Sequence, residues 1–286
     1  EIPYSKKYTV DGTNHLGIYF NTMNFTVNDE SLGSISHEQL IVIPGTTYTV
    51  TNSTITMSDG RIVTASPKTL TGYTTKFTGY TIKPNSTTIN AKTTVKANFT
   101  KEANTYKITF DNKSATTAGT TLIYEKYNTG IYLDSDLKTA MTTTTNSITK
   151  PTRSYTVSFN ANNTGITMPS AITKSYSYSG HYTDAVSGTQ MINENGYITN
   201  SFTKTSYTAN ATLYAHWKAK PSVTIPSISK TGYTCSWNTS ADGKGTTYNG
   251  GDVTDKLNTQ TLYAVCAANT YTVTYNSNGG SGTMTN

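Results

Sequence analysis

The chain has 286 residues and a formal net charge of +6, but only 13% of its residues are charged, about half the usual fraction. Its 22 tyrosines and many threonines favour strands, and their regular spacing argues against disorder. Scattered lysines with only two arginines argue against a nucleic-acid partner, and no apolar run approaches the ~18 residues of a membrane span.

The first pair of predicted strands lies before residue 100. These strands are "TGYTTKF" (71–77) and "TTVKANF" (93–99). Apolar residues alternate in the second strand, which places Val95, Ala97 and Phe99 on one face.

A strand of a second type follows as "TYKITF" (105–110), and the Asn- and Gly-containing residues after it predict a turn. The next stretch has no counterpart elsewhere in the chain. Within it, "SDLKTAM" (135–141) predicts a short helix with Ser135 as its N-cap.

The same strand types then recur in order. "SYTVSF" (154–159) repeats the second type, "KSYSYSGHY" (174–182) corresponds to the segment at 71–77, and "ATLYAHW" (211–217) is a closing strand. Such internal repetition indicates a protein built from serial modules.

A last set contains "TGYTCSWNT" (231–239) and the closing strand "QTLYAVC" (260–266). Its entry, "KPSVTIPSISK" (220–230), lacks the long first strand seen in the other sets. "TYTVTY" (270–275) then begins another strand of the second type.

These repeats predict a mainly β protein of small modules stacked in line as an elongated rod. The expected segments are the end of a preceding unit or linker (1–17), a first module (18–103), a second module or inserted unit (104–153), a third module (154–218), a fourth, shortened module with both cysteines (219–268), and the start of a further, truncated repeat (269–286).

Three stretches, "YTVTYNSNGGSGTM", "GYTCSWNTSADGKGTTYNGG" and "TLYAVC", resemble the Listeria–Bacteroides repeat, which is related to internalin B-type B repeats. Residues 33–74 resemble another repeat of the same surface proteins. The resemblance implies β-grasp-like modules in an extracellular, multi-repeat protein of the bacterial cell surface. It implies no enzymatic activity.

Cys235 and Cys266 are the only cysteines in the chain. In the aligned repeats, Cys266 takes the position of Trp217 and Phe99, and Cys235 takes that of Tyr178. A single replacement of a core aromatic residue leaves a costly cavity, whereas a paired replacement is compatible with a disulfide. We therefore expect a Cys235–Cys266 disulfide, with two free buried thiols as the alternative.

No residue pattern predicts catalysis or a cofactor. The four histidines, expected at surface or half-buried strand positions, are His15, His37, His181 and His216. None shares a zinc-binding spacing with another ligand, so no metal is expected. "ADGKGTTY" (241–248) lacks the spacing of a calcium or phosphate loop and predicts a hairpin turn at Asp242-Gly243.

Some bacterial surface modules contain a spontaneous isopeptide bond between a lysine and an Asn or Asp side chain. Lys107, Lys113 and Lys174 lie near predicted strands and are the candidate donors. The alternative is that all three are ordinary solvated lysines.

Tyr214 and Tyr263 alternate off the apolar faces of the closing strands and are the candidate ligand-contact aromatics. The leading functional hypothesis is a non-catalytic stalk or spacer that contacts neighbouring modules. Two alternatives are a module that binds a host glycan or protein through these tyrosines, and a self-assembling subunit of an extracellular filament or pilus.

Overall fold

The computed structural model describes residues 5–10 and 13–282, and side chains from residue 19 onward. The chain is mainly β, with 46% strand and 2% helix, and contains several sheets. It divides into two units that are discontinuous in sequence. The first comprises Glu1–Ile108, Ile123–Ala140 and Thr205–Ala211, and the second comprises Thr109–Leu122, Met141–Lys204 and Thr212–Asn286.

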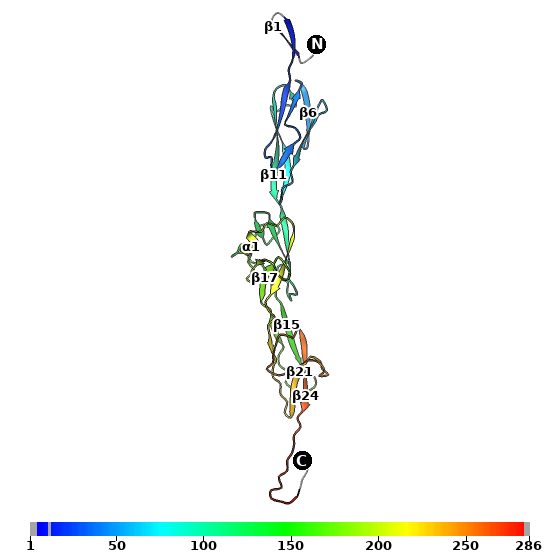
Figure 1. Cartoon of the computed structure of the whole chain (residues 1–286), viewed down its shortest axis with the longest axis vertical. Helices are drawn as coiled ribbons and strands as arrows, with labels where there is room; N and C mark the ends of the chain where they lie inside the picture. The colour runs from blue at the N-terminus through cyan, green and yellow to red at the C-terminus, as the bar shows by residue number, and fades with distance from the viewer. Residues whose placement is uncertain (1–4, 11–12, 283–286) are drawn as a thin grey trace. The chain divides into compact units, whose positions relative to one another are not determined.

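The first unit contains the strands labelled β6 and β11 in Figure 1. Its strands are β1 (Ser5–Val10), β2 (Thr13–Ile18), β3 (Asn21–Val27), β4 (Gly33–Ile35), β5 (Gln39–Val42), β6 (Thr46–Thr51), β7 (Thr54–Met57), β8 (Ile62–Pro67), β9 (Tyr73–Lys83), β10 (Thr88–Ile89), β11 (Thr93–Ala103), most of β13 (Leu122–Lys126) and β14 (Gly130–Tyr132).

Two sheets form the body of this unit, with the strand orders β10-β6-β7-β8-β4 and β5-β3-β11-β9. Both sheets contribute to one core of buried residues: Met23, Phe25, Leu40, Val42, Tyr48, Ile55, Met57, Val63, Ile89 and Val95. The shared core makes this part a β-sandwich. The alternation predicted for residues 93–99 is confirmed, because Val95, Ala97 and Phe99 are buried.

The second unit contains the helix and strands labelled α1, β15, β17, β21 and β24 in Figure 1. Its elements are β15 (Ser154–Asn160), β16 (Ile172–Ser175), β17 (Tyr178–Tyr182), β18 (Gln190–Ile192), α1 (Asn200–Thr203), β19 (Ala211–Trp217), β20 (Val223–Thr224), β21 (Tyr233–Asn238), β22 (Thr247–Tyr248), β23 (Val253–Thr254) and β24 (Gln260–Ala268). β12 (Thr105–Asp111) and β19 each have residues in both units.

Strand pairing in the second unit departs from the expected division into modules. Residues 154–218 were expected to form one module, but β15 pairs with β16 and, in parallel, with β24, whereas β17 pairs with β18 and β19. The chain therefore passes from one sheet to another between Ser175 and Tyr178. The first strand missing from residues 220–230 is supplied by β15, well upstream in sequence.

Two local expectations were wrong. Residues 135–141 form a turn instead of a helix, because the Asp134 carboxylate accepts the backbone N–H groups of Lys138 and Thr139 and Leu137 has a φ of 58°. The single helical turn of the described residues is α1, capped by the Thr199 side chain. The expected strand at 270–275 is not formed among the described residues.

Candidate functional site: a disulfide, a buried histidine and a repeated junction

The two cysteines lie directly opposite each other on β21 and β24 and form a disulfide, with 4.1 Å between their Cα atoms. The predicted bond is confirmed, and no free cysteine remains. Both residues are half-buried, on the strand faces that also carry the buried Trp237 and Leu262. The bond indicates an oxidising environment.

The disulfide closes a loop with a sequence separation of 31. In the chain-entropy model, a loop of this length stabilises the folded state by about 3.5 kcal/mol. The loop encloses β22 and β23, which have only two residues each and contribute little pairing of their own.

Asn238 organises the turn inside this loop, and its role was missed from the sequence. Its side chain is buried, with Nδ2 donating to the carbonyl oxygens of Gly243 and Gly245 and Oδ1 accepting from the N–H groups of Ser240 and Gly245. The predicted turn is confirmed: Gly243 has a φ of 74°, and its N–H donates to the Ser240 carbonyl. One amide side chain thus fixes both ends of the turn.

Tyr214 and Tyr263 do not form a stripe on one sheet. Tyr214 lies opposite Tyr182 across β19 and β17, whereas Tyr263 lies on β24 opposite Asn160 and Asn238. Both tyrosines are half-buried, and the Lys113 ammonium lies 5.0 Å from the centre of the Tyr214 ring. Their roles in binding stay a prediction, without a shared surface to support them.

His181 is fully buried, which corrects the expectation of a surface or half-buried position. Its Nδ1 accepts from the Tyr178 hydroxyl, its Nε2 donates to Asn112 Oδ1 at 3.0 Å, and its ring stacks on Phe110. These partners fit the neutral ring, and burial lowers the pKa of His181 to about 4. Strand alternation did not predict the burial of His181, because this residue lies at a bulge between β17 and β18.

A surface hollow of about 370 Å³ lies beside this cluster in the second unit. Its lining includes Lys113, Arg153, His216 and Trp217. Lys113 Nζ lies 3.3 Å from the Asp111 carboxylate, and His216 Nε2 donates to the Asp184 carbonyl. Much of the polar capacity of the hollow is therefore already used within the protein.

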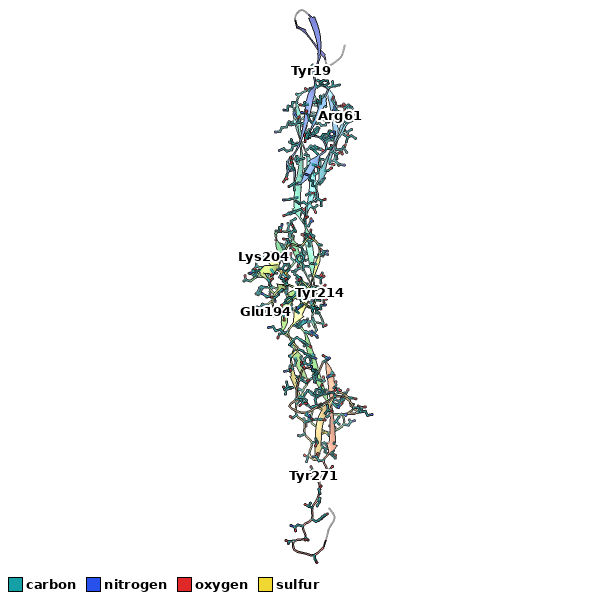
Figure 2. The ribbon with its side chains drawn as sticks, in the orientation of Figure 1. Tyr19, Arg61, Glu194, Lys204, Tyr214 and Tyr271 are labelled. Carbon is teal, nitrogen blue, oxygen red and sulfur yellow. A yellow bond between two sulfur atoms is a disulfide. The ribbon has the colours of Figure 1, made fainter. Side chains whose placement is uncertain are left out.

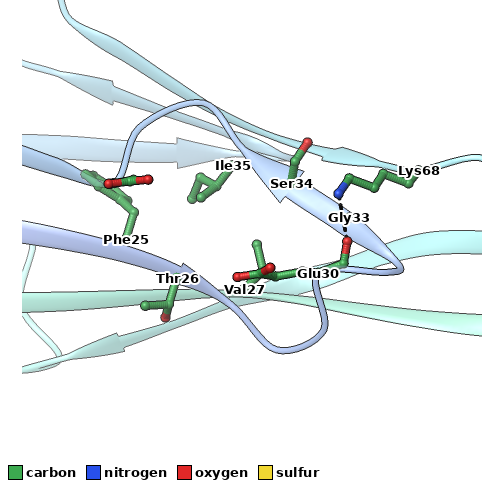
Figure 3. A pocket seen from close by; sticks show the side chains of 9 residues that line it. Phe25, Thr26, Val27, Glu30, Gly33, Ser34, Ile35 and Lys68 are labelled. Atoms are coloured by element: carbon green, nitrogen blue, oxygen red, sulfur yellow. Dashed lines mark hydrogen bonds between the residues drawn. The ribbon is translucent and has the colours of Figure 1, made fainter.

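A second hollow, of about 530 Å³, lies in the first unit between β3 and β4 (Figure 3). Phe25 and Ile35 line it together with the side chains of Glu30 and Glu38. Lys68 spans its edge, and its Nζ donates to the Glu30 carbonyl oxygen at 2.8 Å (Figure 3). This mixture of one cation and two carboxylates shows no preference for a single class of ligand.

The candidate isopeptide donors lie in unremarkable surroundings. Lys107 is exposed, and Lys174 is half-buried opposite Tyr155 on β15. Burial raises the pKa of Glu125, a buried carboxylate whose oxygens accept from the Tyr207 N–H at 3.1 and 3.2 Å. An isopeptide bond stays a prediction, and intact-mass measurement tests it through the loss of ammonia or water.

Two closing strands, β11 and β24, are each followed by a junction with the same three hydrogen bonds. After β11, the Asn104 N–H donates to the Gly72 carbonyl, Asn104 Oδ1 accepts from the Thr74 hydroxyl, and Asn104 Nδ2 donates to the Tyr106 hydroxyl. The three distances are 2.9, 2.6 and 3.3 Å.

After β24, Asn269 makes the same three bonds. Its N–H donates to the Gly232 carbonyl at 2.9 Å, its Oδ1 accepts from the Thr234 hydroxyl at 2.7 Å, and its Nδ2 donates to the Tyr271 hydroxyl at 3.3 Å. Figure 2 labels Tyr271, the aromatic residue of this junction. The repeated "TGYT" and "ANTY" sequences thus encode one defined exit from a closing strand.

No protein family model matches this chain, and no similar protein was found among curated sequences or solved structures. Among residues 5–10 and 13–282, no group of three or more His, Cys, Asp or Glu side chains could hold a metal ion. Within the same residues, no helix has the length and apolar character needed to cross a membrane.

Proposed function

We propose that this chain is a non-catalytic stalk or spacer, formed by serial β-grasp-like modules of a bacterial extracellular surface protein. The observation that carries the proposal is the junction at Asn104 and Asn269, where two closing strands end in the same three hydrogen bonds, the first of them leading directly into β12. A module with a standard exit is suited to repetition in line, as in other repeat proteins.

Two further features support this role. The resemblance of residues 231–286 to Listeria–Bacteroides repeats is to modules of multi-repeat surface proteins. The Cys235–Cys266 disulfide is compatible with an extracellular location. Neighbouring modules are the partners that this role requires.

Small-angle scattering of the whole chain tests the proposal. A compact globule of 286 residues has a radius of gyration of about 19 Å. Modules stacked in line predict a clearly larger value and a long tail in the distance distribution. A radius near that of the compact globule would contradict the stalk.

One observation favours a second candidate function, self-assembly into a filament. Tyr271, Val273 and Tyr275 alternate along residues 270–275 and are all more than half exposed. An alternating segment that is not paired in a sheet can add to a sheet edge of another copy. Light scattering after gel filtration over a concentration series tests this, and a monomer at the highest concentration contradicts it.

A further inference from the structure

The junctions after β11 and β24 share three hydrogen bonds, but they differ in the residues that pack on them. At the first, the ring of Tyr127 lies so close to Gly72 that a Cβ added to Gly72 would overlap it. Tyr127 also meets Tyr73 edge to face, with 5.2 Å between ring centres, and its N–H donates to the Asn104 carbonyl at 2.9 Å. The turn after β13 is therefore docked on the junction by one tyrosine.

The second junction has the same glycine, tyrosine and asparagine, with the glycine in the same conformation, and its lysine comes from a different position in the chain. Gly232 has a φ of 78°, close to the 75° of Gly72. Lys230 lies over the Tyr233 ring at 4.2 Å, as Lys101 lies over Tyr73 at 4.9 Å. In both places a lysine covers a face of the ring.

Within the described residues, no counterpart of Tyr127 packs on this second junction. Apart from its own chain neighbours, no residue has an atom within 4 Å of a Cβ built on Gly232, and Tyr233 is 39% exposed where Tyr73 is half-buried. Within residues 19–282, no backbone N–H donates to the Asn269 carbonyl oxygen. Each group that Tyr127 contacts at the first junction thus has an accessible counterpart at the second.

We propose that Gly232, Tyr233 and Asn269 form a docking site for a tyrosine-bearing turn in the β-hairpin of a following module. The partner has the chemistry of residues 127–130: a tyrosine ring laid on Gly232, its edge against Tyr233, and its own N–H donated to the Asn269 carbonyl. This inference rests on the proposed modular role and specifies how one module is fixed to the next.

The docking site is small, but its proposed partner belongs to a following module of the same chain. A single aromatic contact and one hydrogen bond contribute only a few kcal/mol. When the next module follows Asn269 directly, docking is intramolecular and the effective concentration is high. The glycine is needed for two reasons, since its positive φ and the close approach of the ring both exclude a Cβ.

A tandem chain tests this proposal. Residues 1–271 are joined to residues 107–286 of a second copy, which adds no new sequence at the splice because "ANTY" occurs at both 103–106 and 268–271. Hydrogen exchange is then followed by mass spectrometry in the peptide that covers residues 230–234. This peptide occurs twice in the tandem chain, once followed by a module and once not.

We expect two exchange populations in the tandem chain, one as slow as residues 70–74 and one as fast as in the single chain. The matched variant carries Tyr127→Ala in the second copy only, and it should convert the slow population to the fast one. A single fast population, a slow population that survives the substitution, or a second copy that fails to fold beyond the junction each overturns the docking site.

Failure of docking is distinguishable from failure of the stalk. The scattering curve of the same tandem chain reports its length independently of exchange at Gly232. A lengthened chain with fast exchange rejects the docking site and leaves the stalk, whereas a compact tandem chain rejects the stalk itself.

Discussion

One cross-strand position is filled in two different ways in this protein. Phe99 on β11 faces Phe77 on β9, and Trp217 on β19 faces Tyr178 on β17; both pairs meet edge to face, with ring centres 5.6 and 5.8 Å apart. At the corresponding position of β24 and β21, Cys266 faces Cys235 in a disulfide.

The strands around the two kinds of pair differ in length. Phe77 and Phe99 lie on β9 and β11, which have 11 residues each and pair along most of their length. The loop between the cysteines contains β22 and β23, which have only two residues each. Core size does not explain the difference, because the cluster that contains Phe99 has four buried residues and the core beside the cysteines has eight. We infer that the disulfide holds a loop whose short strands supply little pairing of their own.

Removal of the aromatic pair should have the largest effect. Phe99→Ala leaves a cavity between Phe77 and Gly33 and should destabilise the first unit by about 3–5 kcal/mol. Hydrogen exchange of β9 and β11 in native conditions measures the loss. Lys96→Ala, an exposed change on the same strand, is the control and should have little effect. Equal effects of the two substitutions would contradict a role for the aromatic pair.

Removal of the disulfide should lower stability slightly less than Phe99→Ala does. Cys235→Ala with Cys266→Ala should lower the free energy of unfolding of the surrounding sheet by about 3.5 kcal/mol, the loop-closure value. Urea unfolding followed by Trp237 fluorescence, in a Trp217→Phe background, measures this change. Reductant should shift the midpoint of the parent but not that of the double variant. If reductant leaves the unfolding midpoint of the parent unchanged, the core alone stabilises the sheet.

The Tyr178–Trp217 pair should be sensitive to acid, because Tyr178 is bonded to buried His181. The folded pKa of His181 is about 4, below the ordinary value of 6.5, so the unfolded chain binds its proton first. Stability from the neutral ring is therefore complete above pH 6.5 and is lost as pH falls toward 4, by up to about 3 kcal/mol.

Urea unfolding at pH 7, 6, 5 and 4.5 measures this dependence. His181→Gln keeps a neutral hydrogen-bonding side chain and should flatten the slope between pH 6.5 and 4.5. The same slope in the variant would assign the acid sensitivity to the carboxylates instead.

The sequence predicted these pairs better than it predicted their surroundings. Alternation identified the faces of the closing strands, and alignment of the repeats placed Cys235 and Cys266 in one cross-strand pair. The parallel pairing of β15 with β24 could not be predicted, because a local pattern shows which face is buried but not which distant strand lies beside it. Likewise, the Asp134 turn replaced a predicted helix through side-chain bonds that periodicity does not register.

Replacing both cysteines with aromatic residues should have the smallest effect on stability, and it tests most directly whether the three cross-strand positions are equivalent. If the three positions are equivalent, Cys235→Phe with Cys266→Phe should recover about 1 kcal/mol relative to the double alanine variant, since an edge-to-face pair adds roughly that amount. Urea unfolding in reducing buffer measures the gain, and each single Phe variant is a control that lacks the pair. If the gain in stability equals the sum of the gains of the two single Phe variants, the rings do not meet. The cysteine position would then not be equivalent to the two aromatic positions.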